Sequence, residues 1–133
     1  MVTKIEHIAI AVDNLQEAIV LWENLLGVPC YKQEEVTDQK VITAFFRLGE
    51  VKIELLAGTH DTSPVTKFIS SRGAGIHHIA LSTTALDGEI DRLQNQNFTF
   101  VGDTSVRGAE NKLIRFIQPS STSGALVELC ADQ

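Results

Sequence analysis

The chain has 133 residues, the size of one ordinary domain, so a hydrophobic core can stabilise it without disulfides or a structural metal. Its 44% hydrophobic and 21% charged residues are close to globular averages, and no apolar run approaches the roughly 20 residues needed to span a bilayer. The net charge of -6, with lysine and arginine scattered, disfavours binding to a phosphate backbone. We expect a soluble protein with neither a membrane nor a nucleic-acid partner.

The N-terminal residues and the cysteines indicate the compartment. Residues 1–6 lack the basic segment and long apolar core of a signal or transit peptide, so we expect a cytoplasmic location. Cys30 and Cys130 are far apart in sequence and form no closely spaced redox or zinc motif, so both are interpreted as free packed thiols.

Two segments of the sequence recur, with offsets of 71 and 74 residues. The first pair is Ile5-Glu6-His7-Ile8-Ala9-Ile10 with Ile76-His77-His78-Ile79-Ala80-Leu81, and the second is Val51-Lys52-Ile53-Glu54-Leu55-Leu56 with Ala125-Leu126-Val127-Glu128-Leu129-Cys130. An amphipathic helix pattern follows each copy of the first segment. These repeats predict an α+β fold of two βαβββ modules in a single domain, residues 1–133, with module one at about 4–58, a linker helix at about 62–73 and module two at about 75–131.

Caps and apolar spacing place the helices. The first runs from a cap at Asp13 or Asn14 to a left-handed stop at Gly27, and one face carries Leu15, Ala18, Ile19, Trp22, Leu25 and Leu26. The second repeats that spacing more weakly at Leu86, Ile90 and Leu93. A short helix at about 65–71 follows a capped turn and joins the repeats. Strands are expected at about 4–12, 28–35, 40–48, 51–57, 75–82, 98–102, 111–118 and 124–130.

The alternation of side chains along a strand selects candidate ligands. His7 shares a strand face with Ala9 and Ala11, and His78 shares one with Ala80 and Ser82, so each histidine lies among small residues. Glu54 and Glu128 lie opposite the branched residues of their own strands. If a pseudo-two-fold axis relates the repeats, His7, Glu54, His78 and Glu128 converge in the concave interior of a curved mixed sheet.

These four residues suit a divalent metal. Two imidazoles and two carboxylates with open positions favour cobalt, zinc, nickel, manganese or iron, and the sequence does not choose among these. A buried glutamate among valine, isoleucine and leucine costs several kcal/mol unless a cation or hydrogen bonds compensate. The alternative is that both glutamates face water on an open sheet. His77 has the opposite parity and is interpreted as structural or as a hydrogen-bonding partner of a ligand, and His60 is expected to be exposed in a turn.

The chain resembles the glyoxalase-type vicinal-oxygen-chelate proteins, and among them the methylmalonyl-CoA epimerases most closely. The resemblance spans almost the whole chain and rests on the segments 7–12, 25–27, 52–56, 73–80 and 124–129, together with the linker segment 61–69. It implies paired βαβββ modules, one divalent ion held by His7, Glu54, His78 and Glu128, an acyl-CoA substrate that chelates the ion through two oxygens, and a homodimer. It also implies that Glu128 is a general base, while the second proton donor is unassigned, with Glu54 or a water as candidates.

Two departures from the family pattern concern the substrate. Some epimerases carry a glutamate at the position of Thr43, whose hydroxyl is too weak an acid and base to replace it. Many carry a histidine at the position of Gln118 and a lysine at that of Ser120, so another thioester or acid substrate is also compatible. Thr43, Gln118 and Ser121 are the expected substrate contacts.

Other functions of the same fold fit less well. Glyoxalase I activity predicts an arginine four residues after the first histidine, where Ala11 stands. Ring-cleaving dioxygenases use two histidines and one glutamate and are longer. A metal-free binding module of the antibiotic-sequestering kind replaces the ligands with apolar or aromatic residues, and this chain has only one Trp and one Tyr.

Overall fold

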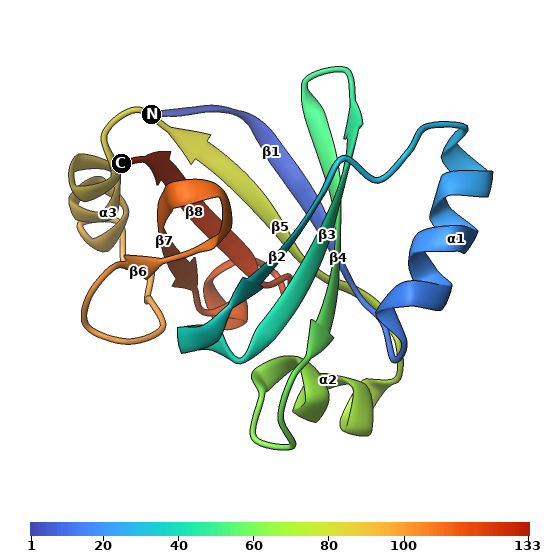
Figure 1. Ribbon diagram of the computed structural model, residues 1–133. Coiled ribbons are helices and arrows are strands. Elements are labelled where there is room, and N and C mark those ends of the chain that lie inside the picture. Colours follow the sequence, from blue (N-terminus) through green and yellow to red (C-terminus); the bar gives the residue numbers. More distant parts are fainter. The chain divides into compact units, whose positions relative to one another are not determined.

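The repeated pattern of apolar residues folds as the sequence predicts. The computed structural model describes all 133 residues. The first repeat consists of β1 (Val2–Ala11), α1 (Leu15–Leu26), β2 (Lys32–Val36), β3 (Val41–Leu48) and β4 (Val51–Gly58). The second consists of β5 (Gly75–Thr83), α3 (Leu86–Gln94), β6 (Val106–Arg107), β7 (Lys112–Ile117) and β8 (Val127–Asp132), and α2 (Pro64–Arg72) separates the two repeats (Figure 1).

All eight strands belong to one mixed sheet of order β2-β3-β4-β1-β5-β8-β7-β6. The first strand of each repeat pairs in parallel with the last strand of the same repeat, β1 with β4 and β5 with β8. The hairpin partners β2 and β3, β3 and β4, β6 and β7, and β7 and β8 are antiparallel. The predicted α+β fold with duplicated βαβββ modules in a mixed sheet is confirmed. No helix is long and apolar enough to cross a membrane.

The chain divides into two compact units, one formed by His7–His77 and the other by Met1–Glu6 with His78–Gln133. In the unit of His7–His77, α1 packs on one face of the strands. The core between α1 and these strands is made of Leu15, Ile19, Ala44, Phe46, Ile53, Leu55 and Ala57. The opposite face packs against α2 through Ala9, Ala11, Val41, Leu56 and Val65. The alternating parity of β1 and β4 therefore separates the face covered by α1 from the face that carries His7 and Glu54, part of which packs against α2.

The other unit repeats this arrangement with α3. Leu86, Ile90 and Leu93 of that helix pack against Ile117 and Leu129 of the strands. A smaller cluster of Ala80, Ile114 and Cys130 lies on the opposite strand face.

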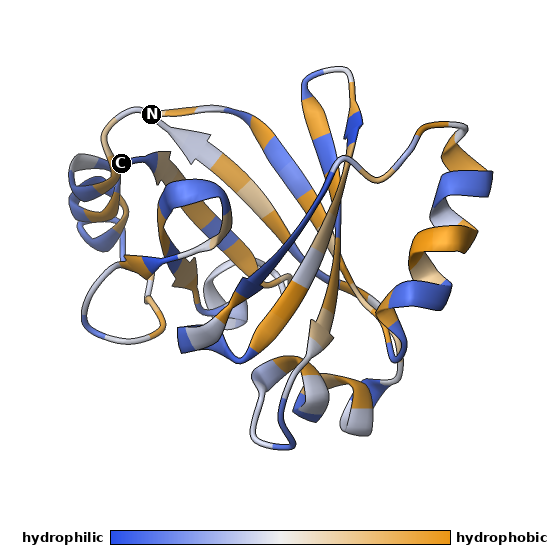
Figure 2. Ribbon diagram, viewed as in Figure 1, coloured by the Kyte–Doolittle hydropathy of each residue, from blue (hydrophilic) through white to orange (hydrophobic).

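Local signals set the helix ends. Asn14 caps α1 by accepting a hydrogen bond from the Glu17 amide, and Gly27 ends the helix at φ 70°, as predicted. Along the ribbon of α1, hydrophilic and hydrophobic residues alternate in bands (Figure 2). Leu25 was assigned to the apolar face and is instead 67% exposed. At about 100° per residue it lies roughly 80° around the helix from Leu15, so it misses the strands.

One strand prediction was wrong. The segment 98–102 forms no strand, because Phe100 makes one isolated bridge to Ile117 and the backbone leaves the sheet at Gly102, where φ is 73°. The strand that precedes β7 is instead the short β6, Val106–Arg107. The strand expected at 28–35 begins only at Lys32. Before it, the Cys30 amide donates to the Glu23 side chain on α1 rather than to a neighbouring strand.

Gly58, at the end of β4, shows why small residues are needed where α2 begins. A Cβ added there would lie 2.0 Å from Oγ1 of Thr66 and 3.0 Å from Cβ of Ser63. Ser63 caps α2 by accepting a hydrogen bond from the Val65 amide. The close approach of β4 to this cap fixes the start of the linker helix.

Candidate metal centre

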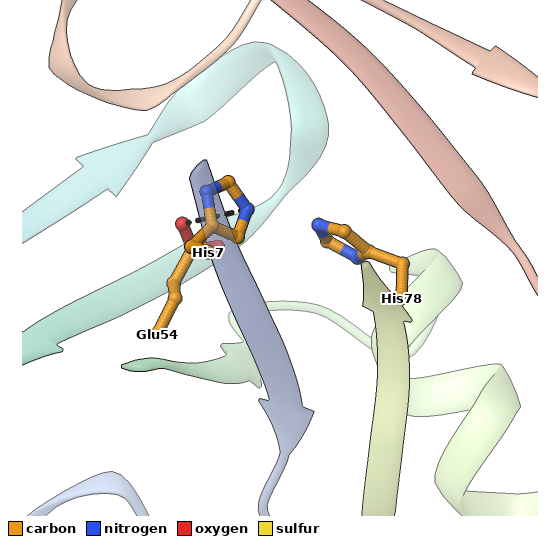
Figure 3. Close-up of side chains that lie close together, drawn as sticks. All are labelled: His7, Glu54 and His78. Carbon is orange, nitrogen blue, oxygen red and sulfur yellow. Dashed lines mark ion pairs between the residues drawn. The ribbon is translucent and has the colours of Figure 1, made fainter. Parts of the chain in front are cut away.

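The first half of the candidate site is a histidine and glutamate pair on β1 and β4. In the parallel register Ala9 is the Cα partner of Glu54, and His7 lies two residues before Ala9 on the same face. Nε2 of His7 is 3.5 Å from Oε2 of Glu54, and each residue is only 5% exposed (Figure 3). Ala9 itself is fully buried and packs in the cluster with Leu56 and Val65.

The second half repeats this pair on β5 and β8. Ala80 is the Cα partner of Glu128, and His78 lies two residues before Ala80. Nε2 of His78 is 3.4 Å from Oε2 of Glu128, and both residues are buried. The ring of Phe116 meets that of His78 edge to face at 5.1 Å and limits its rotation.

A phenylalanine flanks the carboxylate in each repeat. Phe45 is the Cα partner of Glu54, and Phe116 is the Cα partner of Glu128. Phe45 is 1% exposed, so Glu54 has an apolar neighbour on the side away from β1. An ionised carboxylate in such surroundings needs a compensating cation or hydrogen bonds.

Three of the four predicted ligands have donor atoms with the spacing of metal ligands. One ligand atom each from His7, Glu54 and His78 lie within 4.8 Å of one another, and all three residues are buried (Figure 3). Two donors that each lie about 2.1 Å from one ion at angles of about 90–109° are about 3.0–3.4 Å apart. The pairs at 3.5 and 3.4 Å come close to that separation. Imidazole nitrogen and carboxylate oxygen suit the divalent transition metals expected from the sequence, so the residues present fit such an ion.

The expected substrate contacts occupy two places. Thr43 is 1% exposed on β3, and its Oγ1 donates a hydrogen bond to the Glu34 carbonyl at 3.2 Å. Gln118 and Ser121 belong to a tight turn in which the Ser121 amide donates to the Gln118 carbonyl. Oγ of Ser121 also accepts a hydrogen bond from the Thr99 amide at 3.0 Å. Whether these residues touch substrate stays a prediction.

The remaining histidines and the buried cysteine lie as their parity and position indicate. His60 is exposed, with Nδ1 2.8 Å from the Thr59 hydroxyl. His77 packs edge to face against Phe68 at 4.8 Å, and burial lowers the pKa of its imidazole. Cys130 is a free, fully buried thiol. Burial, and next the Glu128 carboxylate, raise its pKa to about 12, so it is a packed neutral group.

Lys52 also lies on the strand face of His7 and Glu54, although it is not among the site residues predicted from the sequence. This lysine is 8% exposed, and it is the Cα partner of His7 on β4. It lies two residues before Glu54 and therefore on the same strand face. The parity rule that selected Glu54 also selects Lys52, so the signal was present.

Comparison with known proteins agrees with this geometry. Residues 6–116 match the model of the Glyoxalase/Bleomycin resistance protein/Dioxygenase superfamily. The chain belongs to this superfamily. The resemblance inferred from the histidine and glutamate segments is thereby confirmed.

The similarity to individual members of the superfamily extends over nearly the whole chain. The uncharacterized protein YqjC of Bacillus subtilis is 40% identical over 127 residues, which are 96% of this chain and 91% of that protein. The mitochondrial methylmalonyl-CoA epimerase of Dictyostelium discoideum is 35% identical over 127 residues, 95% of this chain and 76% of that protein. A solved structure of a methylmalonyl-CoA epimerase in complex with methylmalonyl-CoA and NH4+ matches with a TM-score of 0.94 at 27% identity, covering 99% of this chain and 96% of that chain.

Proposed function

We propose that this superfamily member is a metal-dependent isomerase that interconverts the two stereoisomers of methylmalonyl-CoA by moving the α-proton. The observation that carries the proposal is the duplicated pair of buried side chains, His7 with Glu54 and His78 with Glu128, at 3.5 and 3.4 Å. The similarity to methylmalonyl-CoA epimerases supports the choice of substrate. Because the proposed site draws ligands from both repeats, we also propose that residues 1–133 act as one domain.

The four side chains would hold one divalent ion, whose identity among cobalt, zinc, nickel, manganese and iron is open. When bound, the ion supplies Lewis-acid stabilisation to the oxygens of a carboxylate and thioester that chelate it. The burial of His7, Glu54, His78 and Glu128 lowers the local dielectric, which would strengthen electrostatic stabilisation of an enolate.

Glu128 is the proposed base as well as a ligand. Its carboxylate accepts the α-proton and becomes a carboxylic acid, while the electron pair of the C–H bond enters the enolate. Phe116, the Cα partner of Glu128, forms an apolar side of this half-site. Return of the same proton to the same face regenerates the starting stereoisomer, and delivery of a proton to the opposite face produces the other.

Exchange of the α-proton tests the proposal directly. The metal-loaded protein is incubated with methylmalonyl-CoA in deuterated water, with and without a chelator, and deuterium incorporation is followed by mass spectrometry. We expect exchange that the chelator suppresses and that the Glu128→Gln variant loses. Glu35→Gln, a change at an exposed position of β2, is the matched control and should exchange at the parental rate. Stoichiometric bound metal without exchange above the uncatalysed rate would refute the epimerase activity while retaining the metal site.

The homodimer expected from the resemblance is part of this proposal. Light scattering coupled to size exclusion should give a mass near twice the 14.6 kDa of the chain. A single species at the monomer mass, at concentrations used for turnover, would contradict it.

A further inference from the structure

Arg47 is an exposed cation on the strand face of the first repeat that carries Glu54. Its guanidinium lies 4.9 Å from the centroid of the Tyr31 ring, and that ring lies 6.0 Å from the ring of Phe45. Phe45 is the Cα partner of Glu54, so this run of contacts begins beside the candidate ligand and ends at Arg47. A ring contact uses the flat face of a guanidinium and leaves the N–H groups at its edge for an anion.

The strand register places a second cation in the same row. Arg47 on β3 is the Cα partner of Lys52 on β4, and Lys52 is the Cα partner of His7 on β1. Directly opposed residues of neighbouring strands point to the same side of a sheet. Lys52 is only 8% exposed, whereas Arg47 is exposed. The row therefore leads from a candidate metal ligand to a cation at the surface.

The other end of this strand face is closed within the first repeat. Two residues beyond Glu54 along β4, Leu56 lies in the cluster that packs against α2. Thr43, the Cα partner of Leu56, is 1% exposed. A long substrate whose reacting end lies at Glu54 must therefore leave this face of the repeat on the side of Arg47.

The position of Arg47 decides which part of such a substrate it meets. Arg47 is one strand and two residues from Glu54, so their Cα atoms are about 8 Å apart on a flat sheet, with strands about 4.8 Å apart and a rise of about 3.4 Å per residue. Tyr31 directly precedes β2, on the side of β3 away from β4. Because the guanidinium lies over Tyr31, it points away from Glu54. It would therefore meet a part of the substrate remote from the reacting acyl group.

The charge of the protein makes a local cation necessary for an acyl-CoA. The chain carries a net charge of -6, which repels a polyanion unless positive groups lie along its path. The anionic groups of coenzyme A that are remote from the thioester are its phosphates. An arginine donates two parallel hydrogen bonds to phosphate oxygens, which a lysine does not.

The two repeats differ in this row. Counted from the paired glutamate and phenylalanine of each repeat, the positions of Arg47 and Lys52 correspond to Gln118 and Leu126 in the second repeat. The candidate ligands are duplicated, whereas the two cations occur in the first repeat alone. One substrate has one coenzyme moiety, so one repeat is enough to bind it.

We propose that Arg47, held over the Tyr31 ring, binds the phosphate groups of the coenzyme A moiety, an inference that rests on the proposed function. The guanidinium donates hydrogen bonds to the phosphate oxygens, and Lys52 adds positive charge to the row. The phosphates are remote from the reacting carbon, so this contact is equally strong in the substrate complex and in the transition state. It therefore sets the affinity for the substrate and not the rate of proton removal.

The kinetics of α-proton exchange with two thioesters test this assignment. Methylmalonyl-CoA is compared with the methylmalonyl thioester of pantetheine, which lacks the phosphates. In Arg47→Gln we expect the KM for methylmalonyl-CoA to rise about 10-fold, as for the loss of a hydrogen bond to a charged group, with kcat unchanged. The KM for the pantetheine thioester should keep its parental value.

Arg72→Gln is the matched control. The Arg72 guanidinium also lies over an aromatic ring, that of Phe68 at 5.8 Å, but it belongs to α2. We expect parental KM values for both thioesters in this variant. A rise in the KM for methylmalonyl-CoA equal to that in Arg47→Gln would refute a specific role of Arg47.

Two further results would overturn the proposal. A parental KM for methylmalonyl-CoA in Arg47→Gln shows that the guanidinium does not bind the substrate. An equal rise in the KM for both thioesters assigns Arg47 a structural role on this face.

Binding of coenzyme A itself separates this inference from the proposed function. Isothermal titration calorimetry should show about 10-fold weaker binding of coenzyme A to Arg47→Gln than to the parental protein. A parental protein that exchanges no α-proton refutes the proposed function, whatever its affinity for coenzyme A. Equal affinities of the parental protein and Arg47→Gln for coenzyme A refute the role of Arg47, whether or not exchange occurs.

Discussion

Replacing Glu54 by leucine should separate the stability of the fold from the binding of a metal. The carboxylate is buried beside Ala9 and Phe45, and leucine has a similar volume without a charge to desolvate. Burying the leucine side chain and removing the carboxylate should raise the metal-free free energy of unfolding by about 1–3 kcal/mol.

The same substitution should abolish stabilisation by metal. A ligand at 100 times its Kd stabilises a native protein by about 2.7 kcal/mol, which raises the Tm of a domain of this size by about 10 °C. We expect the parental protein to show a rise of this order with a binding metal, and Glu54→Leu to show none.

Thermal unfolding by circular dichroism, with chelator and with each candidate metal, measures both quantities. Glu35→Leu, at an exposed position of β2, is the control and should keep the metal-dependent rise. A full metal-dependent rise in Glu54→Leu would show that Glu54 is not a ligand. Metal-free destabilisation of about 3 kcal/mol or more would show that contacts of the carboxylate outweigh its desolvation.

Three further predictions concern the rest of the fold. Hydrogen bonds from Arg92 and then from the amino terminus lower the pKa of Glu89 to about 2, so its contribution of about 1 kcal/mol should be present above pH 4.5 and disappear as the pH falls toward 2. In urea unfolding, the loss of unfolding free energy caused by Glu89→Gln should be smaller at pH 3 than at pH 6. An equal loss at both pH values would contradict this prediction. Gly58→Ala should lower the free energy of unfolding by about 1–3 kcal/mol, because the added Cβ would overlap the Thr66 hydroxyl on α2. Gly88→Ala, whose added Cβ has its nearest contact at 3.9 Å, should instead stabilise α3. Equal effects of the two substitutions on the free energy of unfolding would refute the close contact at Gly58. Cys130, with its pKa raised to about 12, should react with thiol reagents at pH 8 only as fast as the protein unfolds, and rapid labelling of the native protein would exclude a buried neutral thiol.

The candidate ligands were predictable because two independent regularities agree on them. The 71-residue repeat selects His7 and His78, and strand parity separates Glu54 and Glu128 from their branched neighbours. The structure places each histidine within 3.5 Å of the glutamate of its own repeat. Local capping residues were equally sufficient to predict the ends of α1, where Asn14 is the N-cap and Gly27 the C-cap.

Other features depend on contacts that no local pattern encodes. The residues around Phe100 have the β-branched and aromatic composition of a strand, but the backbone turns away at Gly102 after a single bridge. Leu25 fits a helical apolar spacing but faces outward, because the width of the buried stripe depends on which strands α1 covers.

The duplication explains why a metal site is easier to infer than a reaction. An ion that accepts one histidine and one carboxylate from each repeat is compatible with two-fold symmetry, so the repeats preserve those residues. A chiral substrate has no such symmetry, and the groups that act on it must differ between the repeats. The row of Lys52 and Arg47 in the first repeat, against Leu126 and Gln118 in the second, is such a difference close to the ligands. Chemistry in a duplicated fold is therefore best sought where equivalent rows of the sheet carry unlike residues.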